Sequence, residues 1–163
     1  MKKVIYSALA IAIIAISSCG NNAEENTKAA SKKTEVQKEP EAPLAPASER
    51  ITLSNKGVGP IKNIELAAID PEMVKRGMEL FKTNCSACHK IDKRFIGPSP
   101  KGVTQRRSPE WIMNMILEPQ MMVEQDRCAK DLLVEFNGAA MANQNMTEEQ
   151  ARDILEYFRT LEE

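Results

Sequence analysis

The chain has 163 residues, enough for one modest domain with additional segments. Its formal net charge of −1 gives no overall attraction to nucleic acid, so nucleic-acid binding is not expected. Only 4% of the residues are aromatic, and a small domain with so few large rings usually needs disulfides, a metal or a cofactor. The cysteines at positions 19, 85, 88 and 128 are too unevenly spaced to resemble a disulfide framework.

Residues 1–18 are typical of a secretory signal peptide. A basic start at Lys2 and Lys3 precedes a mostly apolar run at 4–16, which is too short for a transmembrane helix. Two small residues and Cys19 follow, and this pattern resembles the lipobox of bacterial lipoproteins. The resemblance implies cleavage before Cys19, lipidation of its thiol and new amino group, and anchoring of an exported protein to a bacterial membrane. The alternative is an ordinary signal peptide in which the cysteine has no role.

Residues 19–50 have the composition of a flexible linker that follows the lipidated cysteine. They are polar, with prolines near the end, and cannot bury enough apolar surface to offset the entropy of ordering. About 30 such residues would span roughly 30 Å as a coil. Residues 51–70 mix apolar side chains with glycine and proline, and we expect an irregular, partly packed N-terminal extension that wraps the domain.

Helix signals begin at Asp70. Aspartate can cap a helix and proline suits its first position, so Asp70 and Pro71 predict a helix that runs to about Asn84. A second start of this kind is the Ser-Pro-Glu sequence at 108–110, and Pro119 is expected to end that helix.

Two further helices are expected in the last third of the chain. One covers about 127–136, stops at the Asn-Gly pair 137–138, and carries Cys128 as a buried thiol. The other begins with a capping box formed by Thr147 and Gln150. Because no alternating strand pattern is present, the predicted fold is all-α. The last helix carries apolar residues at helical spacing: Ala151, Ile154, Leu155, Phe158 and Leu161.

The most specific motif is Cys-Ser-Ala-Cys-His at residues 85–89. Cysteines at this spacing can each form a thioether with a haem vinyl group, and the next residue, His89, can then coordinate the iron. A thioredoxin-like pair would need a βαβ context, and a zinc site would need more partners than Cys128 provides. The motif therefore predicts one haem c, attached at Cys85 and Cys88, with His89 as an axial ligand.

Residues 75–89 resemble the start of a class I (mitochondrial-like) cytochrome c, and the resemblance covers a haem domain at 71–163. It implies that Gly77 and Phe81 lie where the first and last helices cross, with Phe81 packed against Tyr157 or Phe158.

The Gly-Pro pair at 97–98 also matches this family. The match implies that the carbonyl of Pro98 accepts a hydrogen bond from the imidazole of His89 and makes it a better ligand. Pro100 stands where the family often has leucine.

His89 is the only histidine, so bis-histidine ligation within the chain is excluded, and the resemblance implies a methionine as the sixth iron ligand. The family carries this ligand on a loop shortly before the last helix, where this chain has Met141, although Ala142 replaces the usual proline. Met113 and Met115, on an expected helix, are assigned to core packing. Three alternatives to Met141 remain open: Met121, Met122 and Met146.

The charges are unevenly distributed. Residues 90–107 contain six basic residues and one acidic residue, an aspartate, whereas residues 110–163 contain twelve acidic and four basic residues. The basic segment either steers an acidic partner to the haem edge or is a solvated loop with one arginine that neutralises a haem propionate. The basic residues are Lys90, Lys93, Arg94, Lys101, Arg106 and Arg107.

The resemblance implies a one-electron carrier with His89 and Met141 as axial ligands rather than an enzyme. Its partners would be redox proteins: a terminal oxidase, nitrous-oxide reductase or another exported reductase, or a quinol-oxidising complex. The haem domain would lie in the periplasm or otherwise outside the cytoplasmic membrane. The alternative is a haem protein with an open sixth site that acts as a gas sensor or weak peroxidase.

Overall fold

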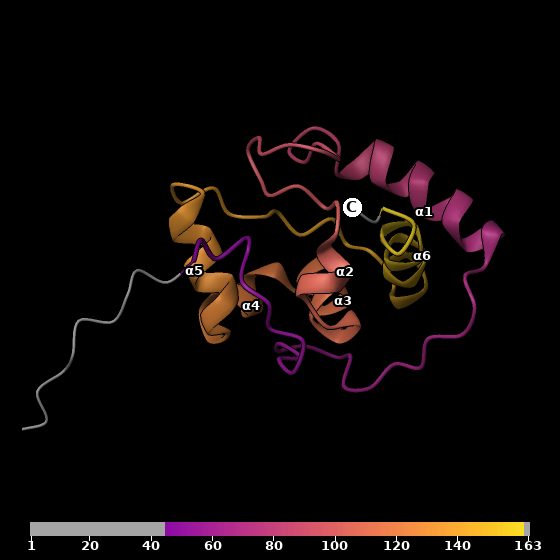
Figure 1. Cartoon of the computed structure of the whole chain (residues 1–163), viewed down its shortest axis with the longest axis horizontal. Helices are drawn as coiled ribbons and strands as arrows, with labels where there is room; N and C mark the ends of the chain where they lie inside the picture. The colour runs from indigo at the N-terminus through magenta and orange to yellow at the C-terminus, as the bar shows by residue number, and fades with distance from the viewer. Residues whose placement is uncertain (1–44, 162–163) are drawn as a thin grey trace, which may run out of the picture. The chain divides into compact units, whose positions relative to one another are not determined.

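The computed structural model describes residues 45–161, which belong to a compact unit at 40–163. The predicted signal peptide 1–18, the cysteine expected to be lipidated, Cys19, and most of the predicted linker lie outside the described residues. Within 45–161 the fold is helical, with two isolated β-bridges and no strand, so the all-α prediction is confirmed. No helix in this part is long and apolar enough to cross a membrane. The helices are α1 (Pro71–Asn84), α2 (Val103–Arg106), α3 (Pro109–Leu117), α4 (Pro119–Gln125), α5 (Arg127–Glu135) and α6 (Glu148–Phe158) (Figure 1).

Side-chain caps define where the longer helices begin. The carboxylate of Asp70 accepts hydrogen bonds from the first turn of α1, and the hydroxyl of Ser108 does the same for α3. At α6 both bonds of the predicted capping box form between Thr147 and Gln150. Asp126 caps α5 and also accepts a hydrogen bond from the indole of Trp111, which ties α5 to α3.

Helices α1 and α6 lie against each other and make the most extensive helix–helix contact within the described part of the chain (Figure 1). A Cβ atom on Gly77 would lie 2.0 Å from the carbonyl oxygen of Asp153, so only glycine permits this close crossing. The ring of Phe81 has its centroid 5.8 Å from those of both Tyr157 and Phe158. The crossing has the residues and the aromatic contacts that the sequence predicted.

Two short helices were not expected from the sequence. Pro119 does end α3, but it also occupies the first position of α4, where its missing N–H costs nothing. Helix α2 has four residues and follows Gly102, which has a positive φ of 65°. Both helices are too short to carry a periodic apolar signal, which explains why they were missed.

The extension before α1 is irregular and docks on α3. The side chain of Asn114, fully buried on α3, accepts a hydrogen bond from the N–H of Ile61 at 2.9 Å. The same side chain donates to the carbonyls of Ile61 and Lys56. Farther along, Arg159 donates to the carbonyl of Ala67 at 2.9 Å. One buried amide therefore satisfies three backbone groups of a segment that has no helix or strand of its own.

The packed part of the chain begins before Ile51. Ala47 is only 4% exposed, and the N–H of Ser48 donates to the carboxylate of Glu135 at 2.9 Å. The end of the stretch expected to be linker, 19–50, is therefore held against α5. Composition could not predict this contact, because its partners are almost 90 residues away along the chain.

Candidate functional site

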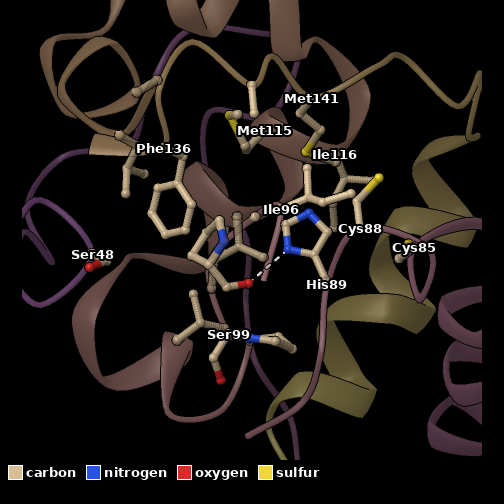
Figure 2. Close-up of a pocket in the computed structure, with 18 of the residues that line it drawn as sticks. Ser48, Cys85, Cys88, His89, Ile96, Ser99, Met115, Ile116, Phe136 and Met141 are labelled. Carbon is tan, nitrogen blue, oxygen red and sulfur yellow. Dashed lines mark hydrogen bonds between the residues drawn. The ribbon is translucent and has the colours of Figure 1, made fainter. Parts of the chain in front are cut away.

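A largely apolar cavity opens where the end of α1, the loop at 96–100, α3, α5 and the segment at 139–142 meet (Figure 2). Each of these segments contributes apolar side chains, and a few polar groups lie at its wall. Such a lining suits a mostly apolar ligand that carries a few polar groups. Its apolar residues include Phe81, Ile112, Met115, Ile116, Val123, Leu132, Leu133 and Phe136.

The three residues of the motif lie at one wall of the cavity. Cys85 ends α1, and the N–H of His89 donates to the carbonyl of Cys85 at 2.9 Å, so the chain makes one more turn beyond the helix. Both thiols of the motif are free; Cys85 is half-buried and Cys88 is exposed. Burial, together with the neighbouring Cys88, raises the pKa of Cys85 to about 11. The turn thus brings the sulfurs of both cysteines and the imidazole of His89 to the same wall of the cavity.

The imidazole of His89 is held in one orientation by the loop that follows it. Its Nδ1 lies 2.7 Å from the carbonyl oxygen of Pro98, the pairing that the sequence suggested. Because a carbonyl can only accept, Nδ1 carries the proton and Nε2 keeps its lone pair for a metal. A Cβ atom on Gly97 would lie 2.4 Å from Cε1 of His89, so the backbone of this loop is fitted to the ring.

Of the four methionines considered as sixth ligand, only Met141 lines the cavity of the described domain. Figure 2 shows its thioether facing the ring of His89. Met122 is fully buried elsewhere, with its sulfur 3.1 Å from the N–H of Val58. Met121 is 36% exposed on α4, and Met146 packs at the edge of the hydrophobic core.

Met115 also lines the cavity, which the sequence interpretation missed. It was assigned to core packing together with Met113, and only Met113 is fully in the core. A signal was present, because Trp111, Ile112, Met115 and Ile116 share one face of a helix and all four line the cavity.

A buried guanidinium supplies positive charge at the cavity wall. Arg107 is 3% exposed, and its two terminal nitrogens donate to the carbonyls of Ala47, Arg50 and Arg106. Its Nε has no hydrogen-bond partner among the described residues, and burial lowers the pKa of the group. A buried donor of this kind is suited to a carboxylate such as a haem propionate. The donor set and the apolar lining together fit a haem.

The basic segment between 90 and 107 is not one uniform solvated surface. Arg94 forms an ion pair with Glu135 at 3.1 Å and stacks 3.9 Å from the centroid of Phe136. Lys90 donates to a backbone carbonyl, and Arg107 is buried as described above. Lys93 and Lys101 remain exposed. Because Arg94 is paired with Glu135 and Arg107 is buried, the exposed unpaired positive charge that could steer a partner is smaller than the sequence count suggests.

Comparisons with known proteins agree with this geometry. The sequence profile of the cytochrome c family matches residues 74–162, more than half of the chain. The structure of cytochrome c from Rhodothermus marinus is 41% identical, with a TM-score of 0.62, over 72% of this chain and 94% of that chain. An engineered cytochrome c from the same organism, bound to a carbene intermediate, is also 41% identical, with a TM-score of 0.59 over 72% and 95% of the two chains.

A cytochrome c-553-like protein of Synechocystis sp. is 44% identical over 46 residues. That match covers 28% of this chain and 44% of the relative, so it spans less than half of the relative's length. The family match and the helical architecture confirm the resemblance found in the sequence. The chain belongs to the cytochrome c family and has its class I fold, whose members are electron carriers with covalently attached haem c.

Proposed function

We propose that this domain transfers single electrons with His89 and Met141 as the two axial ligands of a haem attached at Cys85 and Cys88. The observation that carries the proposal is the imidazole of His89, fixed by Pro98 at 2.7 Å and facing a cavity that Met141 also lines. Bound haem c supplies an iron that gains and loses one electron.

The residues of the chain set the properties of that centre. The bond from Nδ1 of His89 to Pro98 orients the ring and raises the basicity of Nε2. A thioether ligand from Met141 favours a comparatively high reduction potential. With a protein ligand on each side, a substrate has no free coordination position, which suits a carrier.

Arg107 is proposed to hold a propionate through its unpartnered Nε. The carbonyls of Ala47 and Arg50 keep its guanidinium at the cavity wall, so the extension before α1 takes part in the site. A buried cation next to the carboxylate offsets the cost of burying that negative charge.

The attachment of the domain is proposed from the sequence. Cytochrome c domains are typically exported, and the apolar run before Cys19 supports export followed by lipidation at that residue. The tethered domain would serve redox proteins within reach of the membrane, such as a terminal oxidase, an exported reductase or a quinol-oxidising complex. Mass spectrometry of the mature protein tests acylation at Cys19, and an unmodified cysteine would contradict the anchor.

The ligand assignment is tested with Met141→His in the haem-loaded protein. If Met141 is the ligand, the new imidazole replaces the thioether, the oxidised protein loses its weak sulfur-to-iron absorption band, and the reduction potential falls. Met121→His is the matched control, because Met121 is exposed outside the cavity and its replacement should leave the band intact. A Met141→His protein that keeps the band of the parent would contradict the assignment.

A further inference from the structure

Helix α3 presents one face to the cavity and the other face to the rest of the protein. Trp111, Ile112, Met115 and Ile116 line the cavity. Asn114 faces away and binds the extension through Ile61. Ser108 caps α3, and buried residues on both faces hold the helix in place. The position of Met115 at the cavity is therefore fixed by the helix that carries it.

Met141 is held in a different way. It lies in an irregular segment between Gly138 and Asn145, which both have positive φ, of 78° and 53°. Its neighbours Ala140 and Ala142 are exposed. Asn143 ties this segment to the end of α3 through a 3.2 Å bond to the carbonyl of Leu117. A segment with few buried contacts opens at low free-energy cost, whereas a buried helix does not.

The two methionines line the same cavity as the imidazole of His89. In Figure 2 the sulfur of Met141 lies near the ring of His89, and the sulfur of Met115 lies farther from that ring, toward Phe136. Methionine is unbranched and has several rotatable bonds, so Met115 can redirect its sulfur without moving α3. Met115 packs against the edge of the hydrophobic core and is partly buried.

We propose that Met115 is a reserve sixth ligand, which binds the iron when the segment at 139–146 moves and Met141 withdraws. The proposal rests on the ligation by His89 and Met141 proposed above. One iron–sulfur bond breaks and another forms, both thioethers are neutral, and no electron or proton is exchanged. The exchange keeps the sixth position filled, so opening of the segment does not admit a diatomic gas.

The test uses the haem-loaded full chain and the variants Met141→Ala, Met115→Leu and the double variant, with Met121→Leu as a matched control outside the cavity. The readouts are the sulfur-to-iron band of the oxidised protein and the rate of carbon monoxide binding to the reduced protein. Met115→Leu and Met121→Leu should keep the parent's band. Met141→Ala should keep a sulfur band, shifted in position, whereas the double variant should lose it and bind carbon monoxide at least tenfold faster than Met141→Ala.

Other outcomes separate this proposal from the function on which it rests. A Met141→Ala protein that lacks the band and binds carbon monoxide as fast as the double variant overturns the reserve role and leaves ligation by Met141 intact. A parent protein without any sulfur band overturns both proposals. Loss of the band in Met115→Leu alone would make Met115 the resident ligand and would overturn both as well. Haem staining on a denaturing gel shows whether each variant carries its covalent haem, and far-UV circular dichroism shows whether it has folded.

Discussion

The α1–α6 crossing and the rim of the cavity are built on different principles. At the crossing, two helix backbones approach at Gly77 and the rings of Tyr157 and Phe158 pack against Phe81, so the contacts are made within the protein. The rim consists of irregular segments, one of which carries the half-exposed side chains of Phe95 and Ile96. Its contacts are a few hydrogen bonds and ion pairs, together with the close packing of one loop against the imidazole of His89. Stability should therefore reside mainly in the first region and redox chemistry in the second.

Replacing Gly77 with alanine should produce the largest loss of stability. The added Cβ would lie 2.0 Å from the backbone of Asp153, and the two packed helices must separate to relieve the clash. We expect a loss of about 3 kcal/mol, at the upper end of the cost of overpacking, despite the better helix propensity of alanine. Denaturant titration measures the loss. An unfolding midpoint equal to that of the parent would show that the crossing is not the stabilising region.

The next effect is expected from Glu156→Gln, at the buried polar centre of α6. Burial opposes the charge of Glu156, but hydrogen bonds from Arg152, Arg159 and the N–H of Asp70 outweigh it and lower its pKa below 4.5. The carboxylate is fully buried, and replacing it should cost about 2 kcal/mol, the range for a charged buried hydrogen-bond partner.

The effect of Glu156→Gln should depend on pH. Because the folded pKa is lowered, the stabilisation is complete above the unfolded value near 4.5 and is lost as the pH falls through the folded pKa. The difference in unfolding free energy between parent and variant should be constant from pH 6 to 7 and shrink below about pH 4.5. A difference that grows on acidification would contradict the direction of the pKa shift.

Gly97→Ala tests the rim and should give the opposite pattern to Gly77→Ala. A Cβ at position 97 would lie 2.4 Å from the ring of His89, so the imidazole must turn away from Pro98. We expect a stability loss of about 1 kcal/mol, because the loop can shift, together with a lower haem content or an altered spectrum. The optical spectrum and the denaturation midpoint are measured on the same preparation. A large loss of stability with a parent-like spectrum would show that the rim contributes to stability rather than to the haem site.

The smallest effect is expected from Arg94→Gln. The ion pair with Glu135 is partly exposed, and pairs of this kind contribute below about 1 kcal/mol. The stack on Phe136 adds a similarly modest amount. The thermal midpoint should change little and the change should shrink in high salt. A decrease comparable to that of Gly77→Ala would mean that the rim carries the stability of the domain.

Local signals in the sequence were enough to predict where α1, α3 and α6 begin and to recognise the haem motif. The caps at Asp70, Ser108 and Thr147 bond to backbone groups only two or three residues farther along the chain. The haem motif is likewise confined to residues 85–89. The aromatic crossing required a resemblance to the family, because α1 and α6 are far apart in the sequence.

The features that escaped prediction depend on distant partners or on ambiguous residues. The extension is held by Asn114, Arg107 and Glu135, whose roles depend on which backbone groups reach them. Pro119 can end one helix or begin another, and here it does both. A methionine on an apolar helix face can belong either to the hydrophobic core or to a cavity wall. The position of α3 in the fold shows that Met115 lines the cavity.

The central claim is that His89 and Met141 hold the iron from opposite sides of the cavity. A crystal structure of the haem-loaded protein, with the iron located by its anomalous scattering, tests it most directly. We expect Nε2 of His89 and the sulfur of Met141 as the two axial ligands, with Nδ1 still bonded to the carbonyl of Pro98. Iron bound to any other side chain, or coordinated by the protein on one side only, would contradict the account.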